Sequence, residues 1–434
     1  AAFFLSSCIA YIRAHRATRF RLLLYGLSLL AFVGALLCKS VAVMLVPLLV
    51  LCEWLLRGPL PSLRTLTARL SPFLLIGIVY VAGMRRMLQT ALVDAPVRDM
   101  GTQWATQTKA LVYYVKLLAF PWELNVEHQF FLGRWEWAVA LSAALLLAIL
   151  AVVWRRGPLA HGMMLWFLLV LAPTFFVPLN VLVNEHRLYI PSAAFALAIA
   201  VAMQSLMRNA RWGAVCVVLW LLIYAGLDMR RTEQWRSPEA LWGAALAQSP
   251  QMPRPHIYMG NALRESGRNR EALQHYARAL SVNPRVLSGG DMVAVYNNMG
   301  AAYLAMEQLD ESVAAYERAL QIDPDYAPAK ASLEGTLALR ADRERAGAQA
   351  LQKQGLLALV RGELDRAAEL LERSLRERPM VQTYMALVQA YERLGDEEGL
   401  RRAYRGLVEL DPNSDRGAEI LKRLRALEER KEQR

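Results

Sequence analysis

The chain has few cysteines, and none of them is placed for chemistry. The four cysteines of the 434-residue sequence all lie in apolar stretches, and no two are spaced for a zinc site or a redox pair. We therefore expect neither a disulfide framework nor a metal, and interpret Cys8, Cys38, Cys52 and Cys216 as small apolar packing residues. The sequence also has no initial Met and no charged segment before its apolar start, which favours a chain that begins inside a longer protein.

Acidic residues are scarce in the first half only. Residues 1–232 contain 21 Lys and Arg but 8 Asp and Glu, whereas residues 233–434 contain 29 and 30. The net charge of +12 therefore comes from the first half, at +13, and the second half is nearly neutral, at −1. A nearly neutral second half offers no basic face, so we exclude nucleic acid as a partner. The apolar first half excludes a single soluble globule.

The first half carries apolar stretches long enough for membrane helices, since a hydrocarbon core of about 30 Å needs roughly 20 apolar residues. Eight stretches qualify, the first of them partial: Ala1–Ile12, Leu22–Cys38, Val41–Leu56, Ser71–Leu88, Glu136–Trp154, Met163–Val177, Leu188–Met207 and Trp212–Leu227. One helix over residues 22–56 would be about 50 Å long, so we expect a break at Lys39 and Ser40. We predict a polytopic helix bundle over residues 1–232.

Clusters of arginine predict the orientation of this bundle. Four short connections carry arginine without any acidic residue, and the positive-inside rule places all four in the cytoplasm. They contain Arg13, Arg16, Arg19 and Arg21; Arg57, Arg64 and Arg69; Arg155 and Arg156; and Arg208 and Arg211. A further span at residues 106–120 would invert this pattern, so we predict an interfacial or re-entrant helix there, with Lys109 and Lys116 outside the lipid. The second half then lies on the non-cytoplasmic side.

From about residue 236 onward, a different period governs the sequence. Gly260, Ala272, Tyr276, Ala279 and Pro284 have the same spacing as Gly300, Ser312, Tyr316, Ala319 and Pro324. Small residues where two helices cross, an aromatic residue between them and a closing proline are the pattern of the 34-residue tetratricopeptide repeat. We predict an α-solenoid over residues 233–434, which makes the whole chain all-α. Its predicted parts are a half repeat at 237–250, repeats at 253–284, 293–324, 348–379 and 381–412, a degenerate copy at 325–345 and a capping helix at 414–434.

Such a solenoid binds a protein or peptide on its concave surface. Asn261, Asn298 and Lys353 fall at concave positions that can hold peptide backbone or carboxylate, so they are the candidate peptide-binding residues. Ile257 stands where a clamp lysine would be, which leaves the clamp incomplete. Asparagine at these positions is also common in repeats that only pack, and both interpretations stay open.

The densest polar cluster of the first half comes directly before a predicted span, at residues 184–192. Arg187 with Glu185 and His186 at a helix start suits an anionic headgroup, because guanidinium groups and helix N-termini both favour phosphate. The alternative is an ordinary interfacial loop in which Arg187 pairs with Glu185 and Tyr189 anchors the chain at the interface.

Lys39 and the pair Glu127 and His128 are the other polar candidates of this half. Lys39 is either a lysine that snorkels to the interface or a further phosphate contact. We interpret Glu127 and His128 as part of a solvated loop.

Several blocks, in order along the chain, resemble one known family. They are Leu37–Ser40 with Glu53–Trp54, Tyr113–Tyr114 with Pro121–Leu124, Glu185–Ser192, and the junction from Gln234 to Pro250. They are similar to bacterial relatives of the transmembrane-and-tetratricopeptide-repeat O-mannosyltransferases. The resemblance implies a GT-C membrane glycosyltransferase, which moves a sugar from a polyprenyl-phosphate carrier to a protein acceptor on the non-cytoplasmic face. It places Arg187 and Tyr189 in an Arg-x-Tyr block and Lys39 in a Ser-Lys-like block.

The resemblance has further implications for site and location. The catalytic acidic residue of GT-C enzymes lies in the first outer loop, which would precede Ala1, so no catalytic residue is assigned. Asn125–His128 replace an aromatic-proline element of the family. The implied location is the bacterial inner membrane, with lipid as a partner and periplasmic repeats. The competing hypothesis is a non-catalytic, membrane-anchored scaffold whose repeats assemble envelope proteins.

Overall fold

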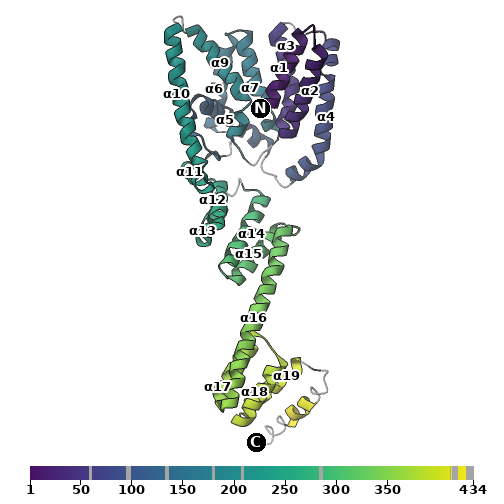
Figure 1. The fold of residues 1–434 in the computed structure, drawn as a ribbon, viewed down its shortest axis with the longest axis vertical. Helices are drawn as coiled ribbons and strands as arrows, with labels where there is room; N and C mark the ends of the chain where they lie inside the picture. Colours follow the sequence, from purple (N-terminus) through teal and green to yellow (C-terminus); the bar gives the residue numbers. More distant parts are fainter. Residues whose placement is uncertain are drawn as a thin grey trace. The chain divides into compact units, whose positions relative to one another are not determined.

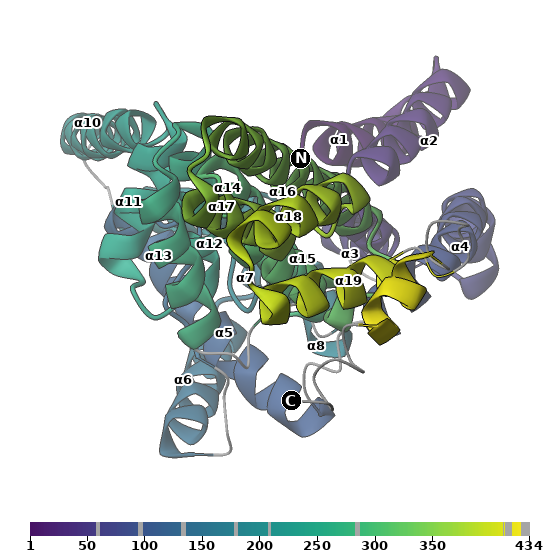
Figure 2. The same ribbon diagram turned by 90° about the horizontal axis from the view of Figure 1, so that it is seen from below.

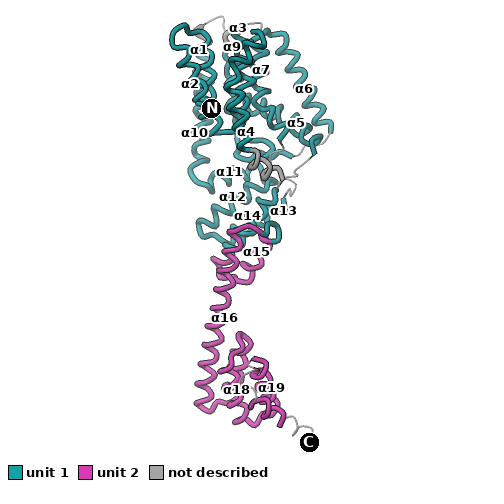
Figure 3. The backbone as a smooth tube through the Cα atoms, turned by 90° about the vertical axis from the view of Figure 1, so that its right-hand side faces the viewer, with its two compact units in different colours: residues 1–302, 321–324 teal, residues 303–320, 325–434 magenta. Residues whose placement is uncertain are grey.

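The structure, a computed structural model, contains helices and no strand in the residues that it describes. These residues are 1–57, 61–93, 99–131, 136–177, 181–206, 210–282, 287–410, 412 and 419–426. The chain divides into two compact units (Figure 3), of which the first comprises residues 1–302 and 321–324 and the second comprises residues 303–320 and 325–434. The prediction of an all-α chain is confirmed.

The first unit begins with a bundle of apolar helices. Its first two helices, α1 (Ala2–Arg16) and α2 (Arg21–Cys38), pack as an antiparallel pair (Figures 1 and 2). Lys39 is extended, with a φ of −162°, and the chain continues through the 3-10 helix η1 (Ser40–Met44) into α3 (Leu45–Arg57). The predicted break after Cys38 is therefore confirmed. Because α1 and α2 run in opposite directions, Arg16 and Lys39 lie at opposite ends of this pair.

Nine further helical segments complete the bundle within the residues that the structure describes. They are α4 (Leu63–Val93), α5 (Met100–Ala119), η2 (Pro121–Glu123), α6 (Trp137–Trp154), α7 (Pro158–Leu171), α8 (Pro173–Phe176) and η3 (Glu185–Leu188), followed by α9 (Pro191–Leu206) and α10 (Ala210–Gln234). Asp99 caps α5, since its carboxylate accepts a hydrogen bond from the Thr102 amide at 2.8 Å. The helix predicted at residues 106–120 thus exists as α5, and its interfacial position stays a prediction.

Among the described residues, four helical stretches are long and apolar enough to cross a membrane: Arg21–Cys38, Leu63–Met84, Trp137–Trp154 and Pro158–Phe176. In α6 only Val139 is buried, while Leu141, Leu145 and Leu147 are exposed. A helix that is apolar on all sides and leaves that surface uncovered is typical of contact with lipid. The eight predicted spans and their orientation stay predictions.

The first repeats belong to the first unit. They comprise α11 (Pro238–Gln248), α12 (Pro253–Glu265), α13 (Asn269–Ser281) and the start of α14 (Gly289–Ala305). At Gly260 the helices α12 and α13 approach so closely that an added Cβ would lie 2.6 Å from the Tyr276 ring. Trp242 stacks on Tyr258 with ring centroids 4.4 Å apart, which joins α11 to α12. The small-residue and aromatic positions of the repeat spacing therefore meet in space.

The bundle and the first repeat share a core. Met252, just before α12, is buried in one cluster with Leu111 and Tyr114 of α5. Asn125 donates from Nδ2 to Ser249 Oγ at 2.9 Å. These contacts cross the boundary predicted after residue 232, and they account for a first compact unit that extends to Ala302.

The second unit holds the remaining repeats. Its helices are α15 (Leu309–Ile322), α16 (Ala327–Arg361), α17 (Leu364–Glu377), α18 (Val381–Leu394) and α19 (Glu397–Leu410). Gly355 faces Leu371 as Gly260 faces Tyr276, since an added Cβ would lie 2.7 Å from Leu371 Cγ. Gly362 ends α16 with a φ of 81°, a conformation that glycine adopts without strain.

The structure differs from the predicted repeat pattern at residues 325–345. These residues do not form a helical pair, because α16 runs for 35 residues through them and through the first helix of the next repeat. Pro328 lies in the first turn, and Gly335 and Gly347 have no positive φ, so nothing in the sequence ends the helix there. Of the predicted capping helix at 414–434, residues 414–418 and 427–434 lie outside the described residues.

Candidate functional site

The polar segment at residues 184–189 is held on a fixed turn before α9. Asn184 begins the turn and accepts a hydrogen bond from the His186 amide at 3.0 Å. Leu182, Val183 and Leu188 are buried on either side of the polar residues. The apolar anchors therefore fix the polar side chains between them, next to α5.

Arg187 donates to neutral oxygen atoms. Its Nη1 donates to the carbonyl of Leu182 at 2.9 Å and to Tyr114 Oη at 3.4 Å, and its Nη2 donates to the carbonyl of Val181 at 2.6 Å. The two carbonyls belong to the same loop, so the guanidinium holds that loop against α5. Among the described residues, no carboxylate pairs with Arg187, and the alternative pairing of Arg187 with Glu185 is therefore wrong.

Glu185 belongs to a different network. Its carboxylate lies 3.2 Å from Arg231 Nη2 and 3.3 Å from His128 Nε2, and it also accepts from the Asn125 amide. Arg231 in turn donates to the Leu124 carbonyl at 2.9 Å. Glu185 thus ties α10 and the segment after η2 to the turn, so its charge is already matched.

Lys39, His186 and Arg187 form a cationic cluster. Desolvation and the charge of Arg187 lower the pKa of Lys39. Desolvation, together with the charges of Lys39 and Arg187, lowers the pKa of His186 to about 4. His186 is therefore neutral at pH 7 and can donate or accept a hydrogen bond. Three residues that the sequence analysis selected from distant positions are thus brought into one electrostatic environment.

This cationic cluster lacks a balancing carboxylate. Within the described part of the chain, the side chains of Lys39 and His186 make no ion pair with an acidic residue, and neither does Arg187. The positive charges of Lys39 and Arg187 are unbalanced, and the neutral imidazole of His186 lies next to Arg187 on the turn. This combination suits a phosphate group. Tyr189 stands apart from these residues, since its side chain is 70% exposed.

Glu127 is buried, and its predicted place in a solvated loop is therefore wrong. Its side chain is 7% exposed and has no hydrogen-bond or ion-pair partner among the described residues. Its amide donates to Asn125 Oδ1 at 3.4 Å, while the neighbouring His128 bonds Tyr113 Oη at 3.1 Å. The loop is therefore held on both sides of the unpartnered carboxyl group. Only the long-range fold brings this burial about, and no local pattern signals it.

The surroundings of Glu127 alter its ionisation. Desolvation raises the pKa of Glu127 to about 7, with Arg254 and Arg187 lowering it and Asp291 raising it. Arg254 and Asp291 lie in the first repeats and form an ion pair at 3.4 Å. The buried carboxyl group thus lies within the electrostatic reach of both Arg187 and the first repeats.

The predicted peptide-binding residues lie in two different units. Asn261 Oδ1 accepts from Tyr276 Oη at 2.8 Å and from Asn298 Nδ2 at 2.9 Å, so the two asparagines are neighbours in the first unit. Ile257 is buried beside them in the repeat core. Lys353 is exposed on α16 of the second unit. Peptide binding by these three residues stays a prediction.

Comparison with known proteins identifies the repeats of the second half of the chain. Residues 251–325 and residues 352–415 match the tetratricopeptide repeat family. The chain carries tetratricopeptide repeats. Two solved repeat structures align with the chain at low similarity. YrrB, described as having an unusual peptide-binding site, aligns with 42% of this chain and 97% of its own at 16% identity and a TM-score of 0.21. The repeat domain of P58(IPK) aligns with 94% of this chain and 95% of its own at 12% identity and a TM-score of 0.23.

Three protein O-mannosyl-transferases are similar to part of this tetratricopeptide repeat protein. Mouse (Mus musculus) protein O-mannosyl-transferase TMTC1 is 27% identical over 219 residues, which are 46% of this chain and 23% of that protein. Mouse TMTC3 is 26% identical over 37% of this chain and 17% of its own length. Human (Homo sapiens) TMTC1 is 31% identical over 30% of this chain and 14% of its own. The homology is therefore distant and partial, and the chain spans about a quarter or less of the length of these relatives.

Proposed function

We propose that this chain is part of a membrane glycosyltransferase of the GT-C type. It would transfer a sugar from a polyprenyl-phosphate-linked donor to a protein acceptor on the non-cytoplasmic face of a bacterial inner membrane. The periplasmic repeats would bind the acceptor. Support comes from four helices suited to crossing a membrane, from the tetratricopeptide repeats, and from partial homology to O-mannosyl-transferases.

The cationic cluster of Lys39, His186 and Arg187 is the observation that carries the proposal. In the transfer, the acceptor oxygen bonds to the anomeric carbon as the bond from that carbon to the carrier phosphate breaks. The electron pair leaves with the phosphate, and a carboxylate takes the proton of the acceptor hydroxyl. Unbalanced positive charge beside the leaving phosphate stabilises the negative charge that develops there.

The three residues of the cationic cluster would contribute in different ways to holding the leaving phosphate. Both Nη atoms of Arg187 donate to the loop, so Arg187 would position the turn and supply charge. Lys39 is exposed and has no acidic partner among the described residues, so its ammonium would contact the phosphate directly. His186, which is neutral at pH 7, would donate a hydrogen bond. Glu185 and Tyr189 would act less directly, through the network around the turn and at its exposed edge.

Binding of a polyprenyl phosphate to the full chain in detergent tests the site. Losing one charge-assisted hydrogen bond costs about 1.5–3 kcal/mol, so Lys39→Ala should weaken binding about ten- to a hundredfold. Lys116→Ala is the matched control, because it removes the same charge from an exposed residue that pairs with Glu123. Arg187→Lys should also weaken binding, since a lysine cannot donate to both loop carbonyls. Equal affinity of wild type, Lys39→Ala, Arg187→Lys and Arg187→Ala would contradict phosphate binding at this cluster.

The second candidate function is a non-catalytic, membrane-anchored scaffold for envelope proteins. The tetratricopeptide repeats favour it, because they bind partners without chemistry. A scaffold would bind protein but would show no preference for a polyprenyl phosphate over a phospholipid. Both candidates place the repeats in the periplasm, and a reporter fused after Arg434 tests this location. If a reporter that works only in the cytoplasm is active in the fusion, the repeats are not periplasmic.

A further inference from the structure

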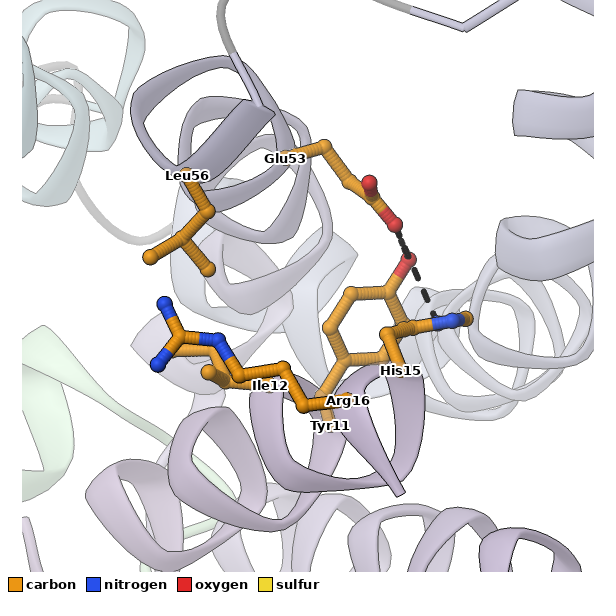
Figure 4. Close-up of a pocket in the computed structure, with 6 residues that line it drawn as sticks. All are labelled: Tyr11, Ile12, His15, Arg16, Glu53 and Leu56. Atoms are coloured by element: carbon orange, nitrogen blue, oxygen red, sulfur yellow. Dashed lines mark hydrogen bonds and ion pairs between the residues drawn. The ribbon is translucent and has the colours of Figure 1, made fainter. Parts of the chain in front are cut away.

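A second polar cluster lies at the end of the bundle opposite to Lys39. There, a cavity of about 340 Å³ is lined by Tyr11, Ile12, His15, Arg16, Glu53 and Leu56 (Figure 4). Tyr11, His15 and Arg16 come from the last turns of α1, and Glu53 and Leu56 come from α3. The cavity therefore lies between these two helices, near the arginine-rich turn that precedes α2.

The floor of the cavity is polar, and its charge is matched. Glu53 is 2% exposed and accepts from Tyr11 Oη at 2.9 Å. Arg69 Nη1 donates to both carboxylate oxygens of Glu53, at 3.0 and 3.1 Å. His15 Nε2 lies 3.8 Å from the same carboxylate. Because Arg69 balances the one acidic side chain, the floor is polar without being anionic.

The rim of the cavity is cationic. The guanidinium of Arg16 lies across the cavity from Glu53 (Figure 4), and no described residue forms a hydrogen bond or ion pair with it. Arg13 of α1, Arg19 of the turn and Arg21 at the start of α2 are exposed and likewise have no acidic partner in the described part of the chain. The field at the cavity mouth is therefore positive and suits an anion.

The cavity also has an apolar side. Ile12 and Leu56 line it, and Leu56 is 43% exposed. Phe20, which precedes α2, and Leu22, in the first turn of α2, are 62% and 86% exposed. An apolar surface next to a cationic rim suits an amphiphile better than a free anion.

We propose that this cavity binds the headgroup of an anionic phospholipid whose headgroup carries hydroxyls, of the phosphatidylglycerol kind. The phosphate would lie at Arg16, because a guanidinium offers paired donors to phosphate oxygens. The headgroup hydroxyls would reach the polar floor at Tyr11 and Glu53, and the acyl chains would follow Leu56 and Leu22. The volume lies within the range of about 300–1,000 Å³ typical of small-molecule sites. This site is independent of the proposed carrier site, which uses the other end of α2.

Titration of the full chain in detergent with phosphatidylglycerol, followed by native mass spectrometry, tests the proposal. Arg16→Ala should weaken phosphatidylglycerol binding about ten- to a hundredfold, the effect of one lost charge-assisted contact. Arg13→Ala is the matched control, because it removes the same charge one helical turn earlier from an exposed side chain that does not line the cavity. Lys39→Ala should leave this binding unchanged, which separates the result from any failure of the carrier site.

Three outcomes would overturn the proposal. Equal losses in Arg13→Ala and Arg16→Ala would show general surface charge instead of a site. Equal affinity for phosphatidylglycerol and phosphatidylcholine would show that the anionic headgroup is not recognised. Binding of free glycerol phosphate as tightly as the lipid would assign the cavity to a soluble phosphate ester. Buried Glu53 is left unchanged throughout, so no result depends on a variant that fails to fold.

Discussion

Helix α6 of the bundle and helix α17 of the repeats differ in how their apolar residues are distributed around the helix. In α6 the apolar residues surround the helix, and Val139 alone is buried. In α17 the buried residues Ala367, Ala368, Leu371 and Ser374 follow one face, and charged residues lie on the opposite face. A one-sided apolar face is satisfied by a neighbouring helix, whereas an all-round apolar surface needs an apolar solvent. The comparison shows that α6 and α17 differ in how much of their apolar surface the rest of the chain covers.

A charge on the exposed surface of α6 should have the largest effect. Leu147 is 65% exposed, so Leu147→Arg creates no internal clash, yet an arginine in the middle of a membrane helix costs about 2.5–3.5 kcal/mol. We expect loss of the protein from the membrane fraction. Val360→Arg is the matched change in the repeats, at a residue that is 84% exposed, and it should change stability by no more than about 0.5 kcal/mol. Normal membrane integration of Leu147→Arg would mean that α6 faces water.

The junction of the two regions should respond to pH through Glu127. Its pKa of about 7 in the folded chain lies above the ordinary value of 4.5, so the folded protein binds the proton more tightly than the unfolded chain does. Stability is then full below pH 4.5 and falls as the pH rises to 7, by about 3 kcal/mol. Glu127→Gln should be more stable than wild type above pH 7 and equal to it near pH 4.5, as measured by unfolding in detergent.

Glu123→Gln is the control for this pH dependence. Glu123 is exposed and pairs with Lys116 at 2.6 Å. Its replacement should have little effect on stability, because solvent screens an exposed ion pair. If Glu127→Gln and wild type lose stability in parallel between pH 4.5 and 7, another group causes the dependence.

The close helix crossings of the repeats should tolerate no added methyl group. Gly260→Ala places a Cβ 2.6 Å from the Tyr276 ring, and Gly355→Ala places one 2.7 Å from Leu371. Overpacking of this kind costs about 1–3 kcal/mol. At Gly335, inside α16, nothing lies within 4 Å of the added Cβ, so Gly335→Ala should instead stabilise the helix by about 0.5–1 kcal/mol. Thermal unfolding that shows the same sign for all three variants would contradict the crossing geometry.

The smallest expected changes in stability concern the asparagine pair, Asn261 and Asn298, and Lys353. Asn298→Ala removes the hydrogen bond to Asn261 and should cost about 1 kcal/mol of stability. Lys353 is exposed, so Lys353→Ala should change stability by less than about 0.5 kcal/mol. A peptide ligand that loses affinity in both variants would support the predicted concave site, and unchanged affinity in both would leave the asparagines with a packing role only.

Local patterns in the sequence predicted much of the fold. The spacing of Gly260 and Tyr276 predicted their close crossing, because the packing of a helix pair depends on short-range period. The break at Lys39 followed from helix length. The continuity of α16 was not predicted, because repeat spacing does not reveal whether a turn is present when no proline or positive-φ glycine marks it.

The site was harder to predict than the fold. Lys39, His186 and Arg187 were selected as polar exceptions in an apolar half, and the structure places them in one field. The partners of Arg187 and Glu185 were not predictable, since Tyr114 and Arg231 are distant in sequence. Burial of Glu127 and the pairing of Glu53 with Arg69 depend on the same long-range packing.

The 35 residues of α16 give the second unit an unusual pattern of local opening. At its two ends, Ala329 and Leu359 are buried against other helices, whereas every residue from 341 to 346 is exposed. This exposed middle segment is held by ion pairs along the helix, such as Arg345 with Asp342 at 3.0 Å, and by the ion pair of Arg343 with Glu307 at 3.5 Å. Its amide hydrogens should therefore exchange with solvent faster than those of either end. A single uninterrupted helix would thus contain the most protease-sensitive point between two protected repeats.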